Sequence, residues 1–85
     1  MELNETIKGM TSEDYKERFK AEYNQLVIRY EKLNDIIKKH FDNTLDFKLS
    51  CNINLLLNQR AAMGTYKEIL EDRAMTEGIE LDLKM

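Results

Sequence analysis

The sequence contains no proline and no tryptophan, and its 85 residues include only three glycines. Because proline and glycine are the residues that most often interrupt helices, their scarcity lets helices run long. There is one cysteine, Cys51, and one histidine, His40. Two such residues form neither a disulfide framework nor a zinc site, so we expect no metal and no cofactor. A single cysteine also fits a reducing cytoplasm.

The sequence also lacks a strong excess of charge, since its formal net charge is −3. A duplex-DNA-binding protein would show a concentrated basic face, so that class is not expected. Apolar runs such as Leu26–Ile28 are too short to cross a membrane, and Glu2 and Glu5 do not suit a signal peptide. A chain of this length is expected to form one domain. It buries little surface alone, so homo-oligomerisation is the expected further source of stability.

The sequence shows clear helical periodicity in its apolar residues. Over residues 11–41 apolar side chains recur at alternating steps of four and three, which predicts one long amphipathic helix. Thr11 is the expected N-cap, with Asp14 as the acid of the first turn. Lys38, Lys39 and His40 place positive charge at the other end, where the helix dipole favours it. The predicted stripe consists of Phe19, Tyr23, Leu26, Tyr30, Leu33, Ile37 and His40.

A second helix is predicted over residues 52–77, because Gly78 stands where a C-capping glycine belongs. Residues 42–51 then form a connecting loop, and the expected fold class is all-α, an antiparallel two-helix hairpin. Residues 1–10 are an N-terminal arm, either a short strand or a flexible segment, and residues 78–85 are an extended tail. The stripe of the second helix shows the three-four spacing in Leu56, Gln59, Met63, Tyr66, Leu70 and Arg73.

Two segments alternate with the period of a half-buried strand. In the loop, Leu45, Phe47 and Leu49 alternate with polar residues, and the same letters fit a loop that tucks Phe47 under the hairpin. The tail alternates in the same way through Leu81 and Leu83. A strand there would need an edge to pair with, in the N-terminal arm or in another chain, and a disordered tail is the alternative.

The sequence gives little support to catalysis. Nucleophilic catalysis needs a serine or cysteine beside a base, and His40 is better explained as a residue at a helix end. Carboxylates at helical spacing, such as Glu68 and Asp72, fit a solvated surface, and there is no glycine-rich phosphate loop. We therefore expect a protein that is not an enzyme and has no catalytic residues.

Polar residues on the apolar stripe are more informative. Arg73 and Gln59 can be paired inside the hairpin, Arg73 with Glu22 and Gln59 with the hydroxyl of Tyr30. Alternatively, Arg73 and the nearby Arg18 face an anionic ligand, because a planar guanidinium binds phosphate through two donors.

A patch of small residues lies in the middle of the second helix, around Ala62 and Gly64. Small side chains allow close packing between protomers or the approach of a flat ligand, and the two are compatible because ligand sites often form at interfaces. A base could stack on a tyrosine while a cation meets its phosphate. The predicted anion-binding residues are Arg18, Arg60, Lys67 and Arg73, the stacking residues are Tyr15 and Tyr66, and the interface residues are Ile28, Ala61, Gly64, Thr65, Leu81 and Leu83.

The stripe residues of the second helix, together with Tyr15, Arg18, Glu22, Leu26 and Lys32-Leu33, resemble a family of very short helical proteins encoded by phages. That family is related to a small gene product of crAss-like phages, and the resemblance covers residues 13–78. It implies a phage origin and action in the cytoplasm of an infected bacterium. In size and architecture the chain is also similar to phage counter-defence sponges, an analogy at the level of fold.

These observations lead to one expected function and two alternatives. The expected function is a non-enzymatic phage protein that counters bacterial immunity by sequestering a nucleotide-derived signal in pockets between protomers. The signal would be a cyclic oligonucleotide or an ADP-ribose derivative. The alternatives are an inhibitor or adaptor that binds a host or phage protein, and a structural helical oligomer. Duplex nucleic acid and membranes are not expected partners.

Overall fold

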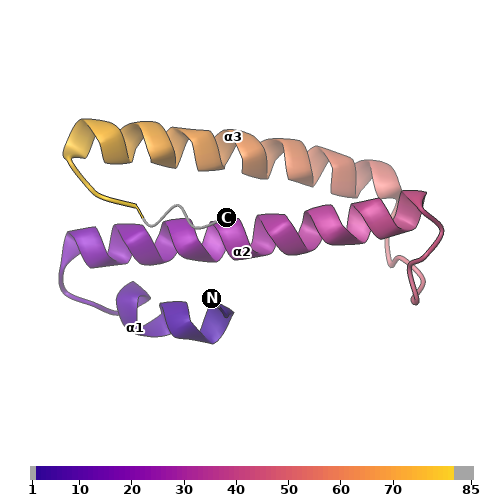
Figure 1. The fold of residues 1–85 in the computed structure, drawn as a ribbon, viewed down its shortest axis with the longest axis horizontal. Helices are drawn as coiled ribbons and strands as arrows, with labels where there is room; N and C mark the ends of the chain where they lie inside the picture. The colour runs from indigo at the N-terminus through magenta and orange to yellow at the C-terminus, as the bar shows by residue number, and fades with distance from the viewer. Residues whose placement is uncertain (1, 82–85) are drawn as a thin grey trace.

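The computed structural model describes residues 2–81, and every regular element within that range is a helix. Two long helices, α2 (Tyr15–Phe41) and α3 (Ile53–Glu77), lie side by side and run in opposite directions (Figure 1). A short segment made of the 3-10 helix η1 (Leu3–Thr6) and α1 (Ile7–Met10) lies along the other side of α2 (Figure 1). The all-helical class is therefore confirmed, and α2 is its central element.

The N-terminal segment is helical, whereas a strand or a flexible arm was predicted. The side chain of Thr6 is buried, and its hydroxyl donates to the carbonyl oxygen of Leu3 at 2.6 Å. A Cβ placed on Gly9 would lie 2.8 Å from the Cβ of Ala21 on α2. Only a residue without a side chain allows this approach, so Gly9 lets the segment pack against α2.

Helix α2 begins at Tyr15, four residues later than expected. Its N-cap is Asp14, whose carboxylate accepts from the backbone N–H of Lys16 at 2.9 Å. Thr11 was the predicted N-cap, and it ends α1 instead, because its hydroxyl donates to the carbonyl oxygen of Ile7 at 3.1 Å. Asp14, which was expected as the acid of the first turn, is therefore the N-cap of α2, and Thr11 is the C-cap of α1.

The loop between α2 and α3 forms no strand, so the predicted strand at Leu45–Leu49 is wrong. The chain leaves α2 through Asn43, whose φ of 60° lies in the left-handed region that asparagine tolerates. Phe47 is 52% exposed, so the alternative of a ring tucked under the hairpin is also wrong. Leu45 and Leu49 are half-buried.

The core lies where α2 meets the C-terminal half of α3. Five of the seven predicted stripe residues of α2 are buried, and Tyr30 and His40 are half-buried. On α3 the buried residues are Leu70 and Ala74. The main cluster consists of Phe19, Tyr23, Leu26, Leu70, Ala74 and Ile79, with Val27, Met63 and Leu81 packed against it.

The face that α3 turns toward α2 differs from the predicted stripe. Gln59, Tyr66 and Arg73 are exposed, and Arg60 and Lys67 are half-buried instead. The predicted bond between Gln59 and Tyr30 is absent among the described residues. A Cβ on Gly64 would lie 3.3 Å from the Tyr30 hydroxyl oxygen, so the small residue there receives the tyrosine ring of α2.

Helix α3 ends as predicted at Gly78, whose φ of 70° is the left-handed conformation of a capping glycine. The N–H of Ile79 returns to the carbonyl oxygen of Ala74 at 2.8 Å, and the Ile79 side chain is buried. Residues 79–81 form no strand. Leu83, a predicted interface residue, lies outside the described residues.

Candidate functional site

Three tyrosines join α2 to α3 through glutamates of the facing helix. The hydroxyl of Tyr15 donates to Glu77 Oε1 at 2.7 Å, and that of Tyr23 donates to Glu71 Oε2 at 2.5 Å. A third bond runs the other way between the helices, from the Tyr66 hydroxyl of α3 to Glu22 of α2. These pairs place polar contacts on the flanks of the apolar core.

Arg73 belongs to the polar group at the end of the hairpin where α2 begins. Its Nε donates to Glu77 at 3.2 Å, its Nη2 donates to the Tyr15 oxygen at 2.9 Å, and its guanidinium lies 5.1 Å from the centre of the Phe19 ring. The hydrogen bond from Tyr15 holds the pKa of Glu77 below its usual value, and Arg73 adds to that effect. Arg73 is thus paired inside the chain, with Glu77 rather than with the predicted Glu22.

Lys67 is also held by a carboxylate. Its Nζ lies 2.8 Å from Glu71 Oε2, the same oxygen that accepts from Tyr23. The hydrogen bond from Lys67 is the main cause that lowers the pKa of Glu71, and the Tyr23 hydroxyl adds to it. Burial, followed by the bond to Glu71, raises the pKa of Tyr23. An anionic ligand at Lys67 would therefore compete with Glu71.

Arg18 supports the turn before α2. Its Nη1 donates to the carbonyl oxygens of Ser12 and Glu13 at 2.9 Å and 2.8 Å. Arg18 is exposed, so the remaining donors of its guanidinium face solvent. Arg18, Lys67 and Arg73 thus each hold a partner within the chain.

Arg60 differs from the other predicted anion-binding residues. It is half-buried on α3, and no ion pair or side-chain hydrogen bond joins it to another residue in the range 2–81. It lies seven residues before Lys67, so the two cations share a face of the helix. A partly buried cation that has no hydrogen-bond acceptor within the chain is suited to bind an anion from solution.

The predicted interface residues have different environments. Ile28 is buried within the chain, one heptad from Ala21 on the face that receives Gly9. Leu81 packs against the chain's own core, and Gly64 faces Tyr30. These contacts lie within one chain, and the interface role of the three residues stays a prediction. Ala61 and Thr65 are exposed and keep their predicted role as an expectation.

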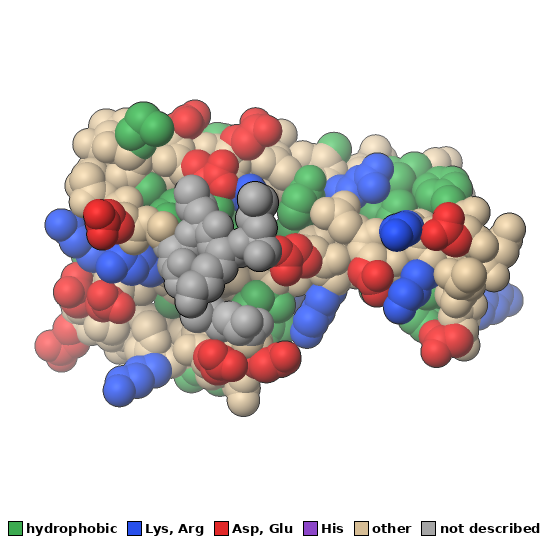
Figure 2. Space-filling view, viewed as in Figure 1, with side chains coloured by type: hydrophobic (Ala, Val, Ile, Leu, Met, Phe, Trp, Pro, Cys, Tyr) green, Lys and Arg blue, Asp and Glu red, His purple; other side chains and the backbone are tan. Residues whose placement is uncertain are grey.

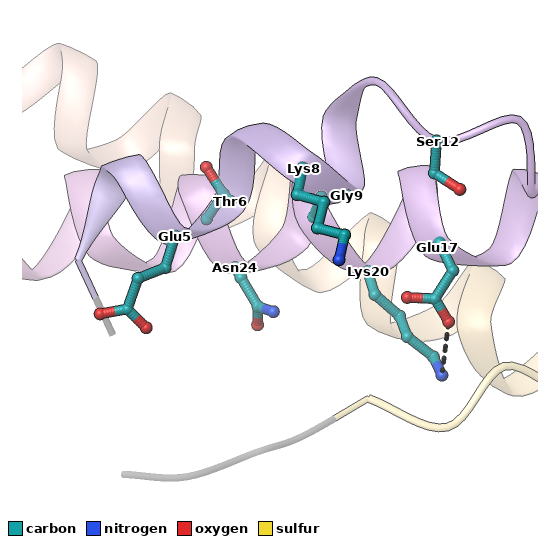
Figure 3. Close-up of a pocket in the computed structure, with 9 residues that line it drawn as sticks. Glu5, Thr6, Lys8, Gly9, Ser12, Glu17, Lys20 and Asn24 are labelled. Carbon is teal, nitrogen blue, oxygen red and sulfur yellow. Dashed lines mark ion pairs between the residues drawn. The ribbon is translucent and has the colours of Figure 1, made fainter.

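An open cleft of about 570 Å³ lies between the N-terminal segment and α2. Figure 3 shows the side chains of Lys8 from α1 and Lys20 from α2 extending toward the same side. Glu17 forms an ion pair of 3.8 Å with Lys20, so the lining carries both charges. This cleft was not predicted from the sequence, because it exists only when the N-terminal segment folds back on α2. The lining residues are Glu5, Thr6, Lys8, Gly9, Ser12, Glu17, Lys20, Ala21 and Asn24.

No group of histidine, cysteine and acidic side chains within residues 2–81 could hold a metal ion. No helix in that range has both the length and the apolar character that crossing a membrane requires.

Comparison with known proteins gives one result. No curated protein and no solved structure matches the chain. A family model named Sequestin matches residues 13–76, which include α2 and nearly all of α3. All six predicted ligand-binding residues lie within that range, and five of the nine residues that line the cleft lie before it. Because the match covers most of the sequence, the chain belongs to the Sequestin family.

Proposed function

We propose that this protein is a non-enzymatic binding protein of a phage, which counters bacterial immunity by sequestering a nucleotide-derived signal in pockets between protomers. The family name supports a sequestering role. The structural support for an anionic ligand comes from Arg60, a half-buried cation that no described residue neutralises. The site acts in the cytoplasm of the infected cell and performs no chemistry on its ligand.

The ligand is a cyclic oligonucleotide or an ADP-ribose derivative. Both carry phosphates, which a guanidinium can bind through two parallel hydrogen bonds. Both also carry flat bases, and Tyr66 and Tyr15 expose 42% and 45% of their surface. An exposed ring offers a stacking platform that tolerates different bases. In this proposal Arg60 and Lys67 bind phosphate on one face of α3, and the tyrosines stack.

Arg73 and Arg18 have a secondary role in the proposal. Each is exposed, and each already donates to oxygen atoms of its own chain. They can add long-range attraction or share unused donors with a phosphate, but neither can leave its partner without a cost. Replacing Arg60 should therefore lower ligand affinity more than replacing Arg18, because Arg60 has no internal bond that competes with the ligand.

A thermal-shift screen against cyclic oligonucleotides and ADP-ribose derivatives tests the proposal. A ligand that binds only the folded state raises the melting temperature in proportion to the logarithm of its concentration above Kd. We expect a shift with one ligand class, which Arg60→Ala reduces and Lys16→Ala does not. Lys16 is an exposed cation in the first turn of α2 and serves as the matched control. A screen that shows no shift with a folded protein would contradict the proposal.

A second candidate is an inhibitor or adaptor that binds another protein. It is favoured by the exposed aromatic residues at the loop end of the hairpin, where Phe41 and Phe47 are 60% and 52% exposed. If this candidate is right, the nucleotide screen shows no shift, and a partner captured by the wild-type chain from infected cells is lost with Phe41→Ser and Phe47→Ser. Retention of the partner by both variants would contradict it.

A further inference from the structure

Tyr30 is the one tyrosine whose hydroxyl donates to no other residue in the range 2–81. The other three tyrosines each donate to a glutamate of the facing helix. Tyr30 is half-buried, and its hydroxyl oxygen lies 3.3 Å from where a Cβ of Gly64 would be. A hydroxyl that is partly removed from water still needs an acceptor, because leaving it unpaired costs free energy. An acceptor from solution, either water or an anion, can pair with it.

Around Tyr23, a hydroxyl from α2 and a cation from α3 hold one carboxylate between them. The Tyr23 hydroxyl donates to Glu71 Oε2 at 2.5 Å, and Lys67 Nζ lies 2.8 Å from the same oxygen. Lys67 precedes Glu71 by four residues, so the two side chains are neighbours on one face of α3. We call Tyr23, Lys67 and Glu71 the Tyr23 group.

The same arrangement recurs one heptad further along the hairpin, without the carboxylate. Tyr30 follows Tyr23 by seven residues on α2, and Gly64 stands seven residues before Glu71 on α3. Because the two helices run in opposite directions, these steps keep the register, and Tyr30 lies over Gly64 (Figure 1). Arg60 precedes Gly64 by four residues and supplies the cation. We call Tyr30, Arg60 and Gly64 the Tyr30 group.

The part of α3 that carries the Tyr30 group contains no acidic residue, since none occurs between Asp46 and Glu68. Figure 2 shows acidic side chains over the C-terminal half of α3, and basic and hydrophobic side chains over its N-terminal half. Arg60 forms no ion pair with another residue in the range 2–81. A glycine inside a helix lowers its stability relative to alanine. In return, Gly64 leaves space beside Arg60 and the hydroxyl above it.

We propose that the Tyr30 group binds one phosphate-type anion, which takes the place that the Glu71 carboxylate has in the Tyr23 group. The Tyr30 hydroxyl donates to one oxygen of the anion, and the guanidinium of Arg60 donates to others. A tetrahedral phosphate presents oxygens in several directions, so it can meet a hydroxyl from one helix and a guanidinium from the other. Both donors belong to a single chain.

This inference deepens the proposed function and rests on it for the natural ligand, which is a phosphate of the sequestered nucleotide. Inorganic phosphate tests the subsite separately, because it carries no base that could stack. Phosphate binding at Tyr30 in a chain that retains no nucleotide would support the subsite and contradict the proposed function. Nucleotide binding that is equal in the wild type and in Tyr30→Phe would overturn the subsite and leave the proposed function standing.

Titration of the full chain with inorganic phosphate, followed by its backbone amide NMR signals, tests the subsite. Sodium chloride of equal ionic strength is the control salt, because screening by salt acts on all exposed charges. We expect shifts that are specific to phosphate and centred on Gly64 and Tyr30. A wild type without phosphate-specific shifts, or with shifts centred elsewhere, would overturn the proposal.

Removing single hydroxyl groups tests the role of Tyr30. Tyr30→Phe should weaken phosphate binding roughly three- to tenfold, the usual effect of one hydrogen bond. Tyr23→Phe is the matched control, because it removes the same atom one heptad away, where Glu71 is the acceptor. It should keep the phosphate affinity of the wild type. Equal phosphate affinity in the wild type and Tyr30→Phe would overturn the proposal.

Replacing Gly64 by glutamate gives the Tyr30 group a carboxylate of its own. Gly64→Glu should abolish phosphate binding, because the new side chain takes the place of the anion and pairs with Arg60. Asn58→Glu adds the same charge at an exposed position of α3 and should retain most of the affinity. Circular dichroism checks that both variants stay helical, and Tyr30→Phe decides the matter if Gly64→Glu does not fold. Wild-type phosphate affinity in a folded Gly64→Glu would overturn the proposal.

Discussion

At the scale of single residues, the contact between α2 and α3 depends on tyrosine hydroxyls as well as on apolar packing. Tyr23 is the most buried of the three tyrosines that pair with glutamates, with 3% of its surface exposed, and it shares its acceptor Glu71 with Lys67. A hydroxyl that is covered by apolar neighbours must keep its hydrogen bond, because leaving it unpaired costs free energy. These pairs fix how the two helices are aligned.

We expect Tyr23→Phe to lower the free energy of unfolding by about 1 kcal/mol, the usual net value of one hydrogen bond. Tyr15→Phe is the matched control, because it removes the same group from a tyrosine that is 45% exposed. It should cost less, since water can replace the lost partner. Urea unfolding measures both values, and an equal loss in the two variants would contradict the assigned role of burial.

The stability of the chain should fall in acid. The pKa of Glu71 is lower in the folded chain than its ordinary value of 4.5, so the folded state binds a proton less readily than the unfolded state. The stabilisation is complete above that ordinary value and is lost as the pH falls through the lower, folded value. With Glu71→Gln, the free energy of unfolding should depend less steeply on pH in the acid range. Glu68→Gln removes an exposed carboxyl from the same helix and should leave most of this pH dependence unchanged. If Glu71→Gln also left the pH dependence unchanged, the assigned role of Glu71 would be contradicted.

At the scale of elements, the sequence determines α2 better than α3. The apolar residues of α2 form one dominant stripe, so its buried face was predictable from spacing alone. Helix α3 carries two apolar stripes, one through Met63 and Leu70 and one through Leu55 and Ile69. The three-four pattern cannot tell which of them faces α2. This is why Arg73 was placed on the inner face, while the structure puts it on the exposed flank.

The N-terminal segment could not be predicted for a different reason. Its helix is too short to be stable alone and exists because it packs on α2. Of the candidate site, the structure leaves Tyr15 and Tyr66 exposed and Arg60 half-buried, and their role in binding stays a prediction. Lys67 and Arg73 each precede a glutamate by four residues, so their pairs with Glu71 and Glu77 follow helical spacing and could have been predicted from the sequence.

Replacing Asp14 tests where α2 begins. We expect Asp14→Ala to destabilise the chain by about 1 kcal/mol, the typical value for loss of an N-cap side chain. Thr11→Ala should cost less, because Thr11 donates to carbonyl oxygens at the end of α1 and caps no N–H of α2. Thermal unfolding compares the two variants, and a larger effect at Thr11 would place the cap where the sequence suggested.

Replacing Gly9 tests how the N-terminal segment packs. We expect Gly9→Ala to lower the free energy of unfolding by roughly 1–3 kcal/mol, the usual cost of overpacking, because the new Cβ meets the Cβ of Ala21. Adding Ala21→Gly removes that contact. The double variant should therefore be more stable than the sum of the two single changes predicts, and strict additivity in urea unfolding would show that the two residues do not touch.

At the scale of the whole molecule, a single chain covers the N-terminal part of α3 poorly. Within the described part of the chain, the first 17 residues of α3, Ile53 to Ile69, include no buried side chain.

The most direct measurement is equilibrium dialysis of the protein against the nucleotide that gives the largest thermal shift, followed by heat denaturation and mass analysis of the released ligand. The proposal predicts that the ligand is retained at a fixed ratio to the protein and is recovered with its mass unchanged. A ligand recovered in altered form, or no retention by the folded protein, would contradict sequestration.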